Sequence, residues 1–522
     1  MILVLLATLA QDPLAVRADT VPLRHDALHY DVYVYLFPSG PRVGMNVRAR
    51  WRITSPDPIR LDLDTVFNIV ATQVNGRTVE ARRNGFALLL PHGARPGDTV
   101  TTAVLYGGAP RDGLVVRGEG AARTVFSDNW PDRARGWLVA QNHPADKATV
   151  RWDVKAPLGL TVVANGALRV ADTAGPAVFW SFEMAEPIPV HTMVIGAARF
   201  AVTRLPPACA VRCVPQSVYS YPQDSAFAID GPFKHATEIV DLLSRRFGPF
   251  PYGELRHVQS STMFGGMENS TAIFYSDRAW SAHRMDDGLV AHETAHQWFG
   301  DAVSQDDWHH LWLSEGFATY GAALWAEHAG GPERLAQVMQ QAAQAVRRSD
   351  VRNRPILDSS ATDLMSLLNP NNYQKGSWVL HSLRGLVGDS AFFQGLRTFY
   401  ERYRHGNALS RDFARVMEAA AGRDLEWFFR QALTQPGYPV LQVVTRREGD
   451  SVTVEVAQVQ DGTWGVFRIP GLVLELNGQR VTLDVDGRTT RKAFSLRGSG
   501  VPALKVDPDS WWLLEVREAG QP

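Results

Sequence analysis

The stretch LVAHETAHQWFGDAV, residues 289–303, decides which fold this chain can have, because it places two histidines around a glutamate inside an apolar run. His292 and His296 are four residues apart, so on an α-helix both imidazoles lie on one face, one turn apart. Two neutral imidazoles in this arrangement can supply two corners of a tetrahedral zinc site. Glu293 can then take a proton from a metal-activated water.

The residues around this motif predict a buried helix. Asp286 or Asp287 can cap its start, and we expect it to end near Gly300. By composition alone, however, an H-E-x-x-H sequence occurs by chance in roughly one or two of every hundred chains of this length. Because a histidine on an apolar face is more often a core residue, the motif needs support from elsewhere in the chain.

The third ligand of a catalytic zinc site is predicted in the next segment, WHHLWLSEGFATYGAALWAEHAG, residues 308–330. Glu315 follows His296 after eighteen intervening residues and lies inside a helical apolar pattern. An acid in such a pattern is costly to bury unless it is paired or bound to a metal. His309 and His310 are rival ligands, but we expect them to be exposed loop residues that precede the helix.

Three separated motifs together resemble one family. H-E-x-x-H followed by Glu315 in WLSEGFATY is similar to the gluzincin metallopeptidases, and more narrowly to the M1 family of zinc aminopeptidases, the aminopeptidase N and leukotriene A4 hydrolase group. FGGMENST, residues 264–271, resembles the G-x-M-E-N exopeptidase motif of that family. NNYQKGSWVL, residues 371–380, resembles the stretch that carries its catalytic tyrosine, here Tyr373. Three motifs in the family's order are far more specific than any one of them.

This resemblance implies a zinc-dependent aminopeptidase that hydrolyses the N-terminal peptide bond of peptides. It implies one Zn²⁺ held by His292, His296 and Glu315, with Glu293 as the general base. Tyr373 would donate a hydrogen bond to the oxyanion that forms during attack on the carbonyl.

The G-x-M-E-N motif implies how the substrate is held. Glu268 would bind the protonated α-amine of the peptide, since a charge-assisted hydrogen bond is stronger than a neutral one. Gly265 and Gly266 lack side chains, so a peptide backbone could approach them closely. Met267 and Asn269 complete the predicted substrate-binding segment. Without the zinc motif, the same five residues would more often be an ordinary glycine-containing turn.

One segment departs from the family pattern. In FSDNWPDRARGWLVAQNHPADKAT, residues 126–149, relatives often place a Glu or Gln that also touches the substrate amine, and this chain has Trp130 at that place. Either Asp128 takes over the role or Glu268 works with less help.

The chain is predicted to be a multidomain α+β protein. An antiparallel β domain is expected over residues 20–205, where MNVRARWRI, residues 45–53, alternates apolar and polar side chains. Helical periods dominate a thermolysin-like, α-rich catalytic domain over 206–435, and strands return in a C-terminal β-sandwich over 436–518. The pairs Asn477-Gly478 and Asp486-Gly487 are typical of hairpin turns.

Many relatives carry a further long helical domain that covers the active site, and because the sequence reaches only a little beyond WWLLEVREAG, residues 511–520, we expect this protein to lack that domain. We therefore expect a more open site, which a second subunit in a homodimer could cover.

The composition excludes several partner classes. The 522-residue chain has a formal net charge of −1 and 45% hydrophobic residues, with acids and bases interspersed and no basic run, so no nucleic-acid surface is expected. The apolar run Ile2–Ala10 is too short to span a bilayer, so no integral membrane segment is expected. It resembles the hydrophobic region of a secretory signal peptide within residues 1–18, although the usual basic start is missing.

We therefore expect export to the periplasm or the extracellular space, with the cytoplasm as the alternative. Cys209 and Cys213, the two cysteines of the chain, would form a small disulfide loop in an exported protein and free thiols in a reducing compartment.

Two other functions remain open. A zinc endopeptidase of the same gluzincin fold would share the metal site without needing Glu268, and it would cleave peptides with blocked N-termini. A catalytically silent binding protein on this fold would be expected to lack a ligand, the base or the tyrosine, and all of these residues are present.

Overall fold

The structure, a computed structural model, describes residues 12–17, 23 and 25–517. These residues form two compact units, each drawn from separate stretches of the chain. Among the described residues, the β-rich unit comprises 23, 25–308 and 397–408, and the C-terminal unit comprises 12–17, 309–396 and 409–517. The run Ile2–Ala10, expected to belong to a signal peptide, lies outside the described residues. No helix among the described residues is long and apolar enough to cross a membrane.

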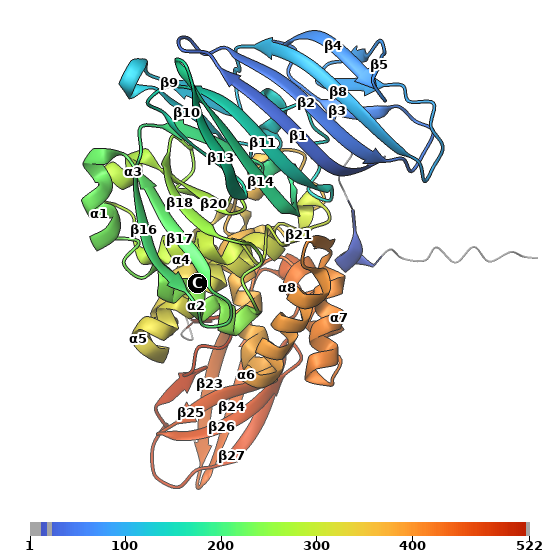
Figure 1. Cartoon of the computed structure of the whole chain (residues 1–522). Coiled ribbons are helices and arrows are strands. Elements are labelled where there is room, and N and C mark those ends of the chain that lie inside the picture. Colours follow the sequence, from blue (N-terminus) through green and yellow to red (C-terminus); the bar gives the residue numbers. More distant parts are fainter. Residues whose placement is uncertain (1–11, 18–22, 24, 518–522) are drawn as a thin grey trace, which may run out of the picture. The chain divides into compact units, whose positions relative to one another are not determined.

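The largest sheet of the β-rich unit has eight strands in the order β13-β14-β11-β1-β2-β8-β4-β5 (Figure 1). The strands are β1 Asp26–Leu36, β2 Val43–Arg52, β4 Asn68–Val74, β5 Arg77–Thr78, β8 Thr99–Gly108, β11 Lys147–Pro157, β13 Ala167–Ala174 and β14 Ala177–Pro189. The predicted alternation in β2 is confirmed, because every second side chain from Val43 to Trp51 is buried. The sequence predicts an antiparallel sheet, and this prediction is wrong for one strand pair, because β1 and β11 pair in parallel.

Two smaller sheets complete the N-terminal part of this unit. One has the order β12-β15-β10-β9 and the other β3-β7-β6. Their strands are β3 Ile59–Asp62, β6 Arg82–Asn84, β7 Ala87–Leu90, β9 Leu114–Arg117, β10 Thr124–Ser127, β12 Thr161–Ala164 and β15 Ile195–Ala198.

The rest of the β-rich unit is built around a five-stranded sheet that carries the predicted substrate segment at its edge. The order is β16-β17-β18-β20-β19, with β16 Ala201–Ala208, β17 Val214–Ser220, β18 Leu255–Ser260, β19 Gly266–Met267 and β20 Ala272–Ser276. Four helices belong to this part: α1 Ser225–Asp230, α2 Ala236–Phe247, α3 Asp277–Ser281 and α4 Asp287–His296. A short parallel pair, β21 Val303–Gln305 and β22 Gly406–Ala408, follows α4.

The two cysteines lie between β16 and β17 and form a disulfide bond. Of the two states that the sequence left open, the structure contains the oxidised one.

The C-terminal unit begins with helices. Its long helix α5, Trp312–Arg348, is kinked at Gly331, which has φ +73 and precedes a proline. A π-helical turn over Asn371–Lys375 leads directly into α6, Gly376–Tyr403. The helices α7, Ser410–Ala421, and α8, Glu426–Thr434, follow.

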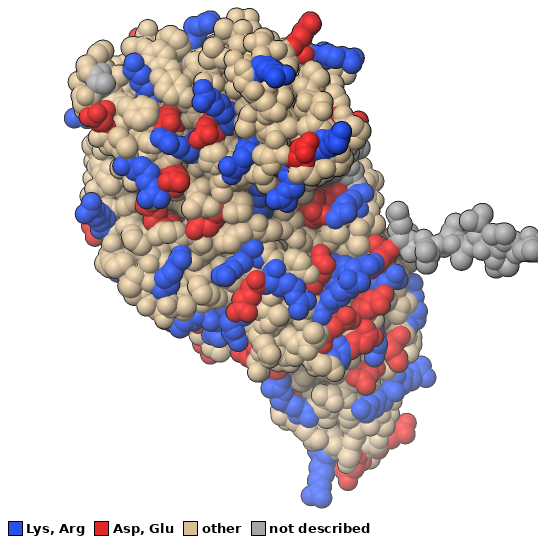
Figure 2. Space-filling view, turned by 45° about the vertical axis from the view of Figure 1, so that its right-hand side comes forward, with Lys and Arg blue, Asp and Glu red and all other residues tan. Residues whose placement is uncertain are grey.

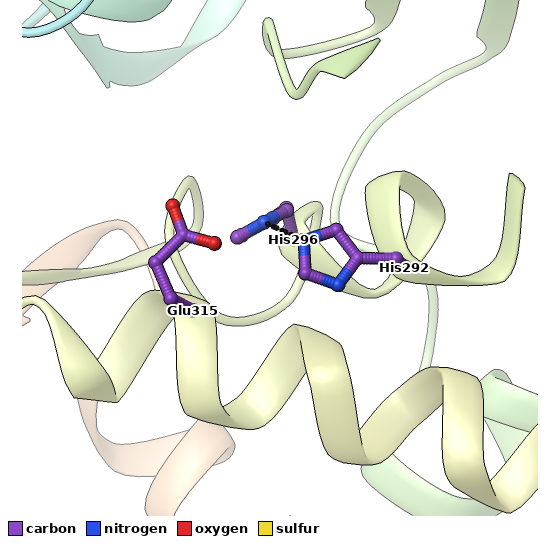
Figure 3. Close-up of side chains that lie close together, drawn as sticks. All are labelled: His292, His296 and Glu315. Carbon is purple, nitrogen blue, oxygen red and sulfur yellow. Dashed lines mark hydrogen bonds between the residues drawn. The ribbon is translucent and has the colours of Figure 1, made fainter. Parts of the chain in front are cut away.

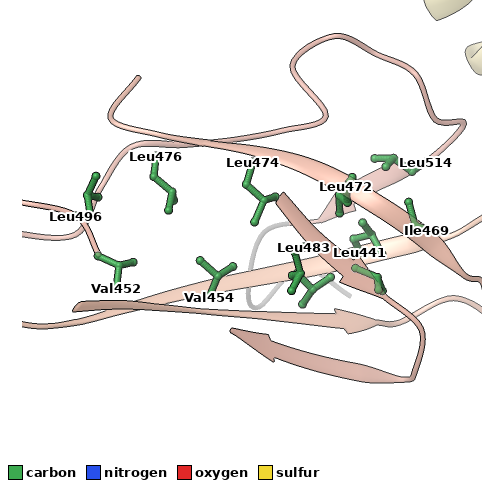
Figure 4. Close-up of a cluster of buried hydrophobic side chains, with 12 residues drawn as sticks. Leu441, Val452, Val454, Ile469, Leu472, Leu474, Leu476, Leu483, Leu496 and Leu514 are labelled. Atoms are coloured by element: carbon green, nitrogen blue, oxygen red, sulfur yellow. The ribbon is translucent and has the colours of Figure 1, made fainter. Parts of the chain in front are cut away.

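A β-sandwich ends the C-terminal unit, as the sequence predicts. One sheet has the order β27-β24-β23-β29 and the other β26-β25-β28. The strands are β23 Val440–Glu448, β24 Ser451–Gln458, β25 Ile469–Leu476, β26 Gln479–Val485, β27 Thr489–Ser495, β28 Leu504–Val506 and β29 Glu515–Arg517. Aliphatic side chains from both sheets fill the space between them (Figure 4).

One of the two predicted hairpins is wrong. Asn477-Gly478 joins the paired strands β25 and β26, and both residues have positive φ, as a two-residue hairpin turn requires. Asp486-Gly487 instead connects β26 to β27, which belongs to the other sheet. The dipeptide signals a turn, but the packing of the two sheets decides whether the next strand pairs with the previous one.

Charged side chains are intermingled on the surface. On the face that Figure 2 shows, Lys and Arg lie beside Asp and Glu over the whole area, which agrees with the interspersed charges of the sequence.

Candidate metal centre

The helix α4 presents two histidines toward one point. Its first turn is capped by Asp286, whose carboxylate accepts a hydrogen bond from Leu289 N at 2.9 Å, so of the two predicted caps the structure uses Asp286. The Nε2 atoms of His292 and His296 lie 3.2 Å apart. Two nitrogens bound to one tetrahedral zinc at about 2.0–2.1 Å would lie about 3.3 Å apart, so this spacing fits a shared metal.

The turn after α4 orients the second histidine. The helix ends at His296, four residues before the predicted end at Gly300, because the next amides turn back by only three residues: Gln297 N donates to Thr294 O at 3.2 Å. This tightening brings Phe299 O to 3.2 Å from His296 Nδ1. If Nδ1 carries the proton and donates to this carbonyl, Nε2 is left with its lone pair for a metal.

Glu315 completes a set of three donors (Figure 3). One ligand atom from each of His292, His296 and Glu315 lies within 4.8 Å of the others. Glu315 is buried in the first turn of α5. Two imidazole nitrogens and one carboxylate oxygen are the donors found at catalytic zinc sites, where the fourth position is left to water or substrate.

A second group of acids lies beside the histidine pair. Carboxylate oxygens of Glu268 and Glu293 and a ring nitrogen of His296 also lie within 4.8 Å of one another, and all three residues are buried. Burial and then the Glu268 carboxylate raise the pKa of Asp301 well above its usual value. Burial and the Glu293 carboxylate likewise raise the pKa of the Tyr275 phenol. Several buried acids in one place favour a metal ion or an ammonium group as their counter-charge.

Gly266 has a packing role that the sequence did not reveal, and close approach of a substrate backbone to it stays a prediction. A side chain at this position would overlap the Glu293 carboxylate, so the missing Cβ makes room for the candidate base. Gly265 has open space around its Cα and is exposed, so close approach of a substrate backbone remains a prediction for that residue. Met267 pairs with Phe274 of β20, which makes this segment the edge strand of its sheet.

Tyr373 lies on the π-helical turn and is half-buried. Two glycines fix this turn against α5: a Cβ at Gly316 would lie 2.9 Å from the carbonyl carbon of Gly376 and 3.0 Å from its Cα. Gly316 follows Glu315 directly, so this contact sets the distance between the elements that carry Glu315 and Tyr373.

Asp128 is held by hydrogen bonds to the loop before the G-x-M-E-N segment. Its Oδ1 accepts from Thr262 Oγ1 at 3.2 Å, and its Oδ2 accepts from Met263 N at 3.0 Å and pairs with Arg133 Nη2 at 2.8 Å. With both oxygens engaged, Asp128 acts as an anchor of this loop. Which of the two predicted alternatives applies to the substrate amine stays a prediction.

The prediction for His309 and His310 is wrong. Both are buried rather than exposed, on a single 3₁₀ turn before α5. His309 Nε2 lies 2.8 Å from Ala361 O, and His310 Nδ1 lies 2.8 Å from Ser410 Oγ. Their partners are distant in sequence, so the burial could not be seen from the local pattern.

Two functional candidates escaped the sequence analysis. Gln297 is fully buried and bonds to the Glu268 segment. Lys147 is half-buried, and its Nζ donates to Asp301 O at 2.8 Å and Ala302 O at 2.9 Å, which holds the turn after α4. For Gln297 the signal is a polar residue directly before Trp298 and Phe299, but only the fold shows what Gln297 and Lys147 contact.

Known proteins resemble this chain over most of its length. Residues 232–431 match the peptidase family M1 domain. Aminopeptidase N of Streptomyces lividans is 28% identical over 425 residues, which cover 74% of this chain and 49% of that protein. A leucyl aminopeptidase of Saccharolobus solfataricus is 24% identical over 485 residues, which cover 85% of this chain and 58% of the relative. The chain thus spans about half the length of the curated relatives that it matches.

One solved structure matches this chain over most of the length of both chains. The crystal structure of an M1 zinc metallopeptidase from Deinococcus radiodurans superposes with a TM-score of 0.70 and 25% identity, over 80% of this chain and 95% of that one.

Proposed function

We propose that this chain, which belongs to peptidase family M1, is a zinc-dependent aminopeptidase that removes the N-terminal residue of peptides. The observation that carries the proposal is the convergence of His292, His296 and Glu315 within 4.8 Å, with the acid Glu268 beside His296 in the second group. The first set suits a catalytic metal, and the added carboxylate suits the ammonium group that distinguishes a peptide's N-terminus.

In this proposal His292, His296 and Glu315 hold one Zn²⁺, the ion named for the related structure. When bound, zinc lowers the pKa of a water in its open position toward about 7 and polarises the scissile carbonyl. The spacing of the two ring nitrogens and the bond from His296 to Phe299 O support this assignment from the chain's own residues.

Glu293 is the proposed general base. Its carboxylate is buried beside His296 and fills the space that Gly266 leaves. It would take a proton from the attacking water and later deliver a proton to the leaving amine.

Glu268 is the proposed amine-binding residue, and it restricts cleavage to the first peptide bond. The edge strand β19 ends one residue before it, so an extended peptide could add to this edge by backbone hydrogen bonds while its ammonium group meets the carboxylate. Met267 and Asn269 flank the carboxylate and are buried, so they shape this segment from within.

Tyr373 is proposed to donate a hydrogen bond to the oxyanion that forms on the attacked carbonyl. The contact between Gly316 and Gly376 supports this role, because it holds the tyrosine's turn at a fixed distance from the helix that carries Glu315.

Hydrolysis of fluorogenic amino-acid amides tests this function. Each amide is supplied with a free and with an acetylated amine, with and without a zinc chelator. Chelator-sensitive turnover of the free-amine set alone would support the aminopeptidase. Cleavage of the acetylated set would point to the zinc endopeptidase and remove Glu268 from its role. Absence of turnover with zinc bound would support the alternative of a catalytically silent binding protein.

We also propose that the chain is exported, because the bonded pair Cys209 and Cys213 is the state favoured in oxidising compartments. Thiol alkylation of the protein from fractionated cells, without reductant, tests this: two labelled cysteines in a cytoplasmic fraction would contradict it. The homodimer expected from the family resemblance is tested on the same preparation by sedimentation, where the mass of one chain would contradict it.

A further inference from the structure

A buried glutamine joins the helix that carries both histidines to the segment that carries Glu268. Gln297 directly follows His296 and is fully buried. Its Nε2 donates to Glu268 O at 2.8 Å and to Asp301 Oδ2 at 2.9 Å, and its Oε1 accepts from Thr271 N at 2.9 Å. One planar amide thus satisfies three buried partners.

Two of these bonds hold the backbone at Glu268 and just after it. Glu268 O is the backbone carbonyl oxygen of Glu268 itself, and Thr271 N belongs to the residue three positions later. A tight turn lies between them, in which Ala272 N donates to Asn269 O at 3.0 Å. Thr271 has φ +65, a left-handed conformation that a β-branched residue adopts only when its surroundings enforce it. The turn after Glu268 therefore depends on external hydrogen bonds for its shape.

Other anchors hold the same turn from the N-terminal part of the unit. Asn165 Nδ2 donates to Ser270 O at 2.7 Å, and Gly166 N donates to Thr271 Oγ1 at 2.9 Å. These bonds fix the turn to the β domain, whereas Gln297 fixes it to the end of α4. The position of the Glu268 carboxylate relative to His296 is thus set through Gln297.

We propose that Gln297 is a positioning residue for substrate binding: it holds Glu268 at the distance from the metal ligands that a peptide's amine and first carbonyl require. This inference rests on the amine-binding role proposed above for Glu268. A misplacement of about 1 Å in a binding group is enough to cost a large part of the rate, so losing this link weakens recognition of the free amine without removing any group that touches it.

The chemistry of the amide explains why a glutamine is needed. Two donors and one acceptor are used at once, and methionine has neither an N–H nor a strong acceptor at similar length. An ionised glutamate keeps the acceptor for Thr271 N but loses both donors and places a negative charge against Glu268 O and Asp301. Gln297→Met and Gln297→Glu therefore remove the link in two different ways.

Steady-state kinetics of the zinc-loaded full chain tests the proposal, with Gln216→Met as the matched control. Gln216 is a buried glutamine of the same unit, on β17, and is bonded to His257 rather than to the Glu268 segment. We expect Gln297→Met and Gln297→Glu to bind zinc in the wild-type amount and to raise KM for a free-amine substrate about tenfold, with a smaller change in kcat. Gln216→Met should leave KM unchanged.

A double variant separates this role from general support of the fold. If Gln297 acts through Glu268, adding Gln297→Met to Glu268→Gln should raise KM no further than Glu268→Gln does alone. Independent, multiplied effects would overturn the proposal. So would an unchanged KM in both Gln297 variants, or a loss of zinc from both.

Binding of L-leucine and of N-acetyl-L-leucine, measured by calorimetry, distinguishes this inference from the proposed function. A wild-type chain that fails to hydrolyse peptides but prefers the free amine, a preference lost in Gln297→Met, would keep the positioning role and reject the aminopeptidase. Normal turnover of the wild-type chain with an unchanged KM in the Gln297 variants would keep the aminopeptidase and reject the positioning role. Absence of both turnover and amine preference in the wild-type chain would overturn both.

Discussion

The helix α4 and the C-terminal β-sandwich both contain a cluster of buried side chains, but the buried groups are of opposite kinds. The sandwich core consists of twelve aliphatic residues, all less than a tenth exposed (Figure 4). Around α4 the buried set includes Glu268, Glu293, His296, Gln297 and Asp301. Fully burying an aliphatic side chain contributes about 1.5–3 kcal/mol to folding, whereas burying a charge costs free energy unless a partner compensates. The aliphatic core of the sandwich therefore stabilises the fold, whereas the buried polar groups around α4 cost folding free energy and serve the proposed chemistry.

This difference predicts that substitutions in the two regions will separate into two classes. Changes around α4 should reduce turnover at little cost in stability, and changes in the sandwich should do the opposite. Substitutions of Glu293 and of Leu474 test this separation.

The largest expected effect is on turnover, from Glu293→Gln. The amide cannot take the water's proton, so kcat should fall by about 10²–10⁴-fold, the usual contribution of general acid–base catalysis. Zinc content should stay at the wild-type level, and the thermal midpoint should not fall, because a buried charge is removed. Kinetics and differential scanning calorimetry of one preparation check this. Retained turnover would mean that another group is the base.

The next effect is on stability, from Leu474→Ala in the sandwich. Leu474 is fully buried, so the cavity and the lost burial should lower the free energy of unfolding by about 2–5 kcal/mol. KM and zinc content of the folded variant should match the wild type. Val501→Ala, at a side chain that is 73% exposed, is the control and should change stability by less than about 0.5 kcal/mol. A raised KM in Leu474→Ala would break the proposed separation.

Gly316→Ala should affect both properties, because it lies where helix packing positions the candidate tyrosine. The new Cβ would press on the backbone of Gly376, and the two elements must separate at a cost of about 1–3 kcal/mol. The Tyr373 turn would move with them, so kcat should fall while KM changes less. Gly253→Ala, where the space around the Cα is open, is the control. Equal kcat values for the two variants would exclude a positioning role for the glycine contact.

The smallest effect is a change in the pH dependence of stability at His257, a buried residue outside the metal centre. Burial lowers the pKa of this imidazole to about 3, and its Nδ1 lies 3.1 Å from the Tyr275 hydroxyl. The unfolded chain takes up a proton below pH about 6.5 and the folded chain does not, so stability falls from there toward pH 3. The slope reaches at most about 1.4 kcal/mol per pH unit for one group.

His257→Gln should flatten that slope between pH 6 and pH 4, as measured by denaturant unfolding of the two proteins side by side. The comparison cancels the titration of the metal-binding histidines, which both proteins share. Parallel curves would show that His257 is protonated in the folded chain, contrary to its surroundings.

Prediction from the sequence succeeded where the chemistry is local. The spacing of His292 and His296 follows from one turn of helix, and the cap at Asp286 lies within three residues of its partner. The alternation in β2 and the Asn477-Gly478 hairpin are likewise properties of short stretches. The choice of Tyr373 required the family resemblance, because thirteen tyrosines were available.

Prediction failed where a partner lies far along the chain. His309 and His310 are polar and precede a helix, which is typical of a loop, yet Ala361 and Ser410 meet them and they are buried. Asp486-Gly487 is a good turn sequence, but the strand that follows it joins the opposite sheet. Asp128 also has partners far along the chain, because its oxygens accept from Thr262 and Met263, and its role toward the substrate amine stays a prediction.

By itself, the sequence determined which chemical groups this protein possesses: two imidazoles one helical turn apart, a carboxylate between them, and a second acid shortly after two glycines. The tertiary structure decided what those groups contact. The missing side chain of Gly266 leaves room for the Glu293 carboxylate, and Gln297 links the backbone of Glu268 to the end of α4 by a hydrogen bond. The physical reason is range: helix period and turn preference act over a few residues, whereas side-chain packing and buried hydrogen bonds join residues that only the completed fold brings together.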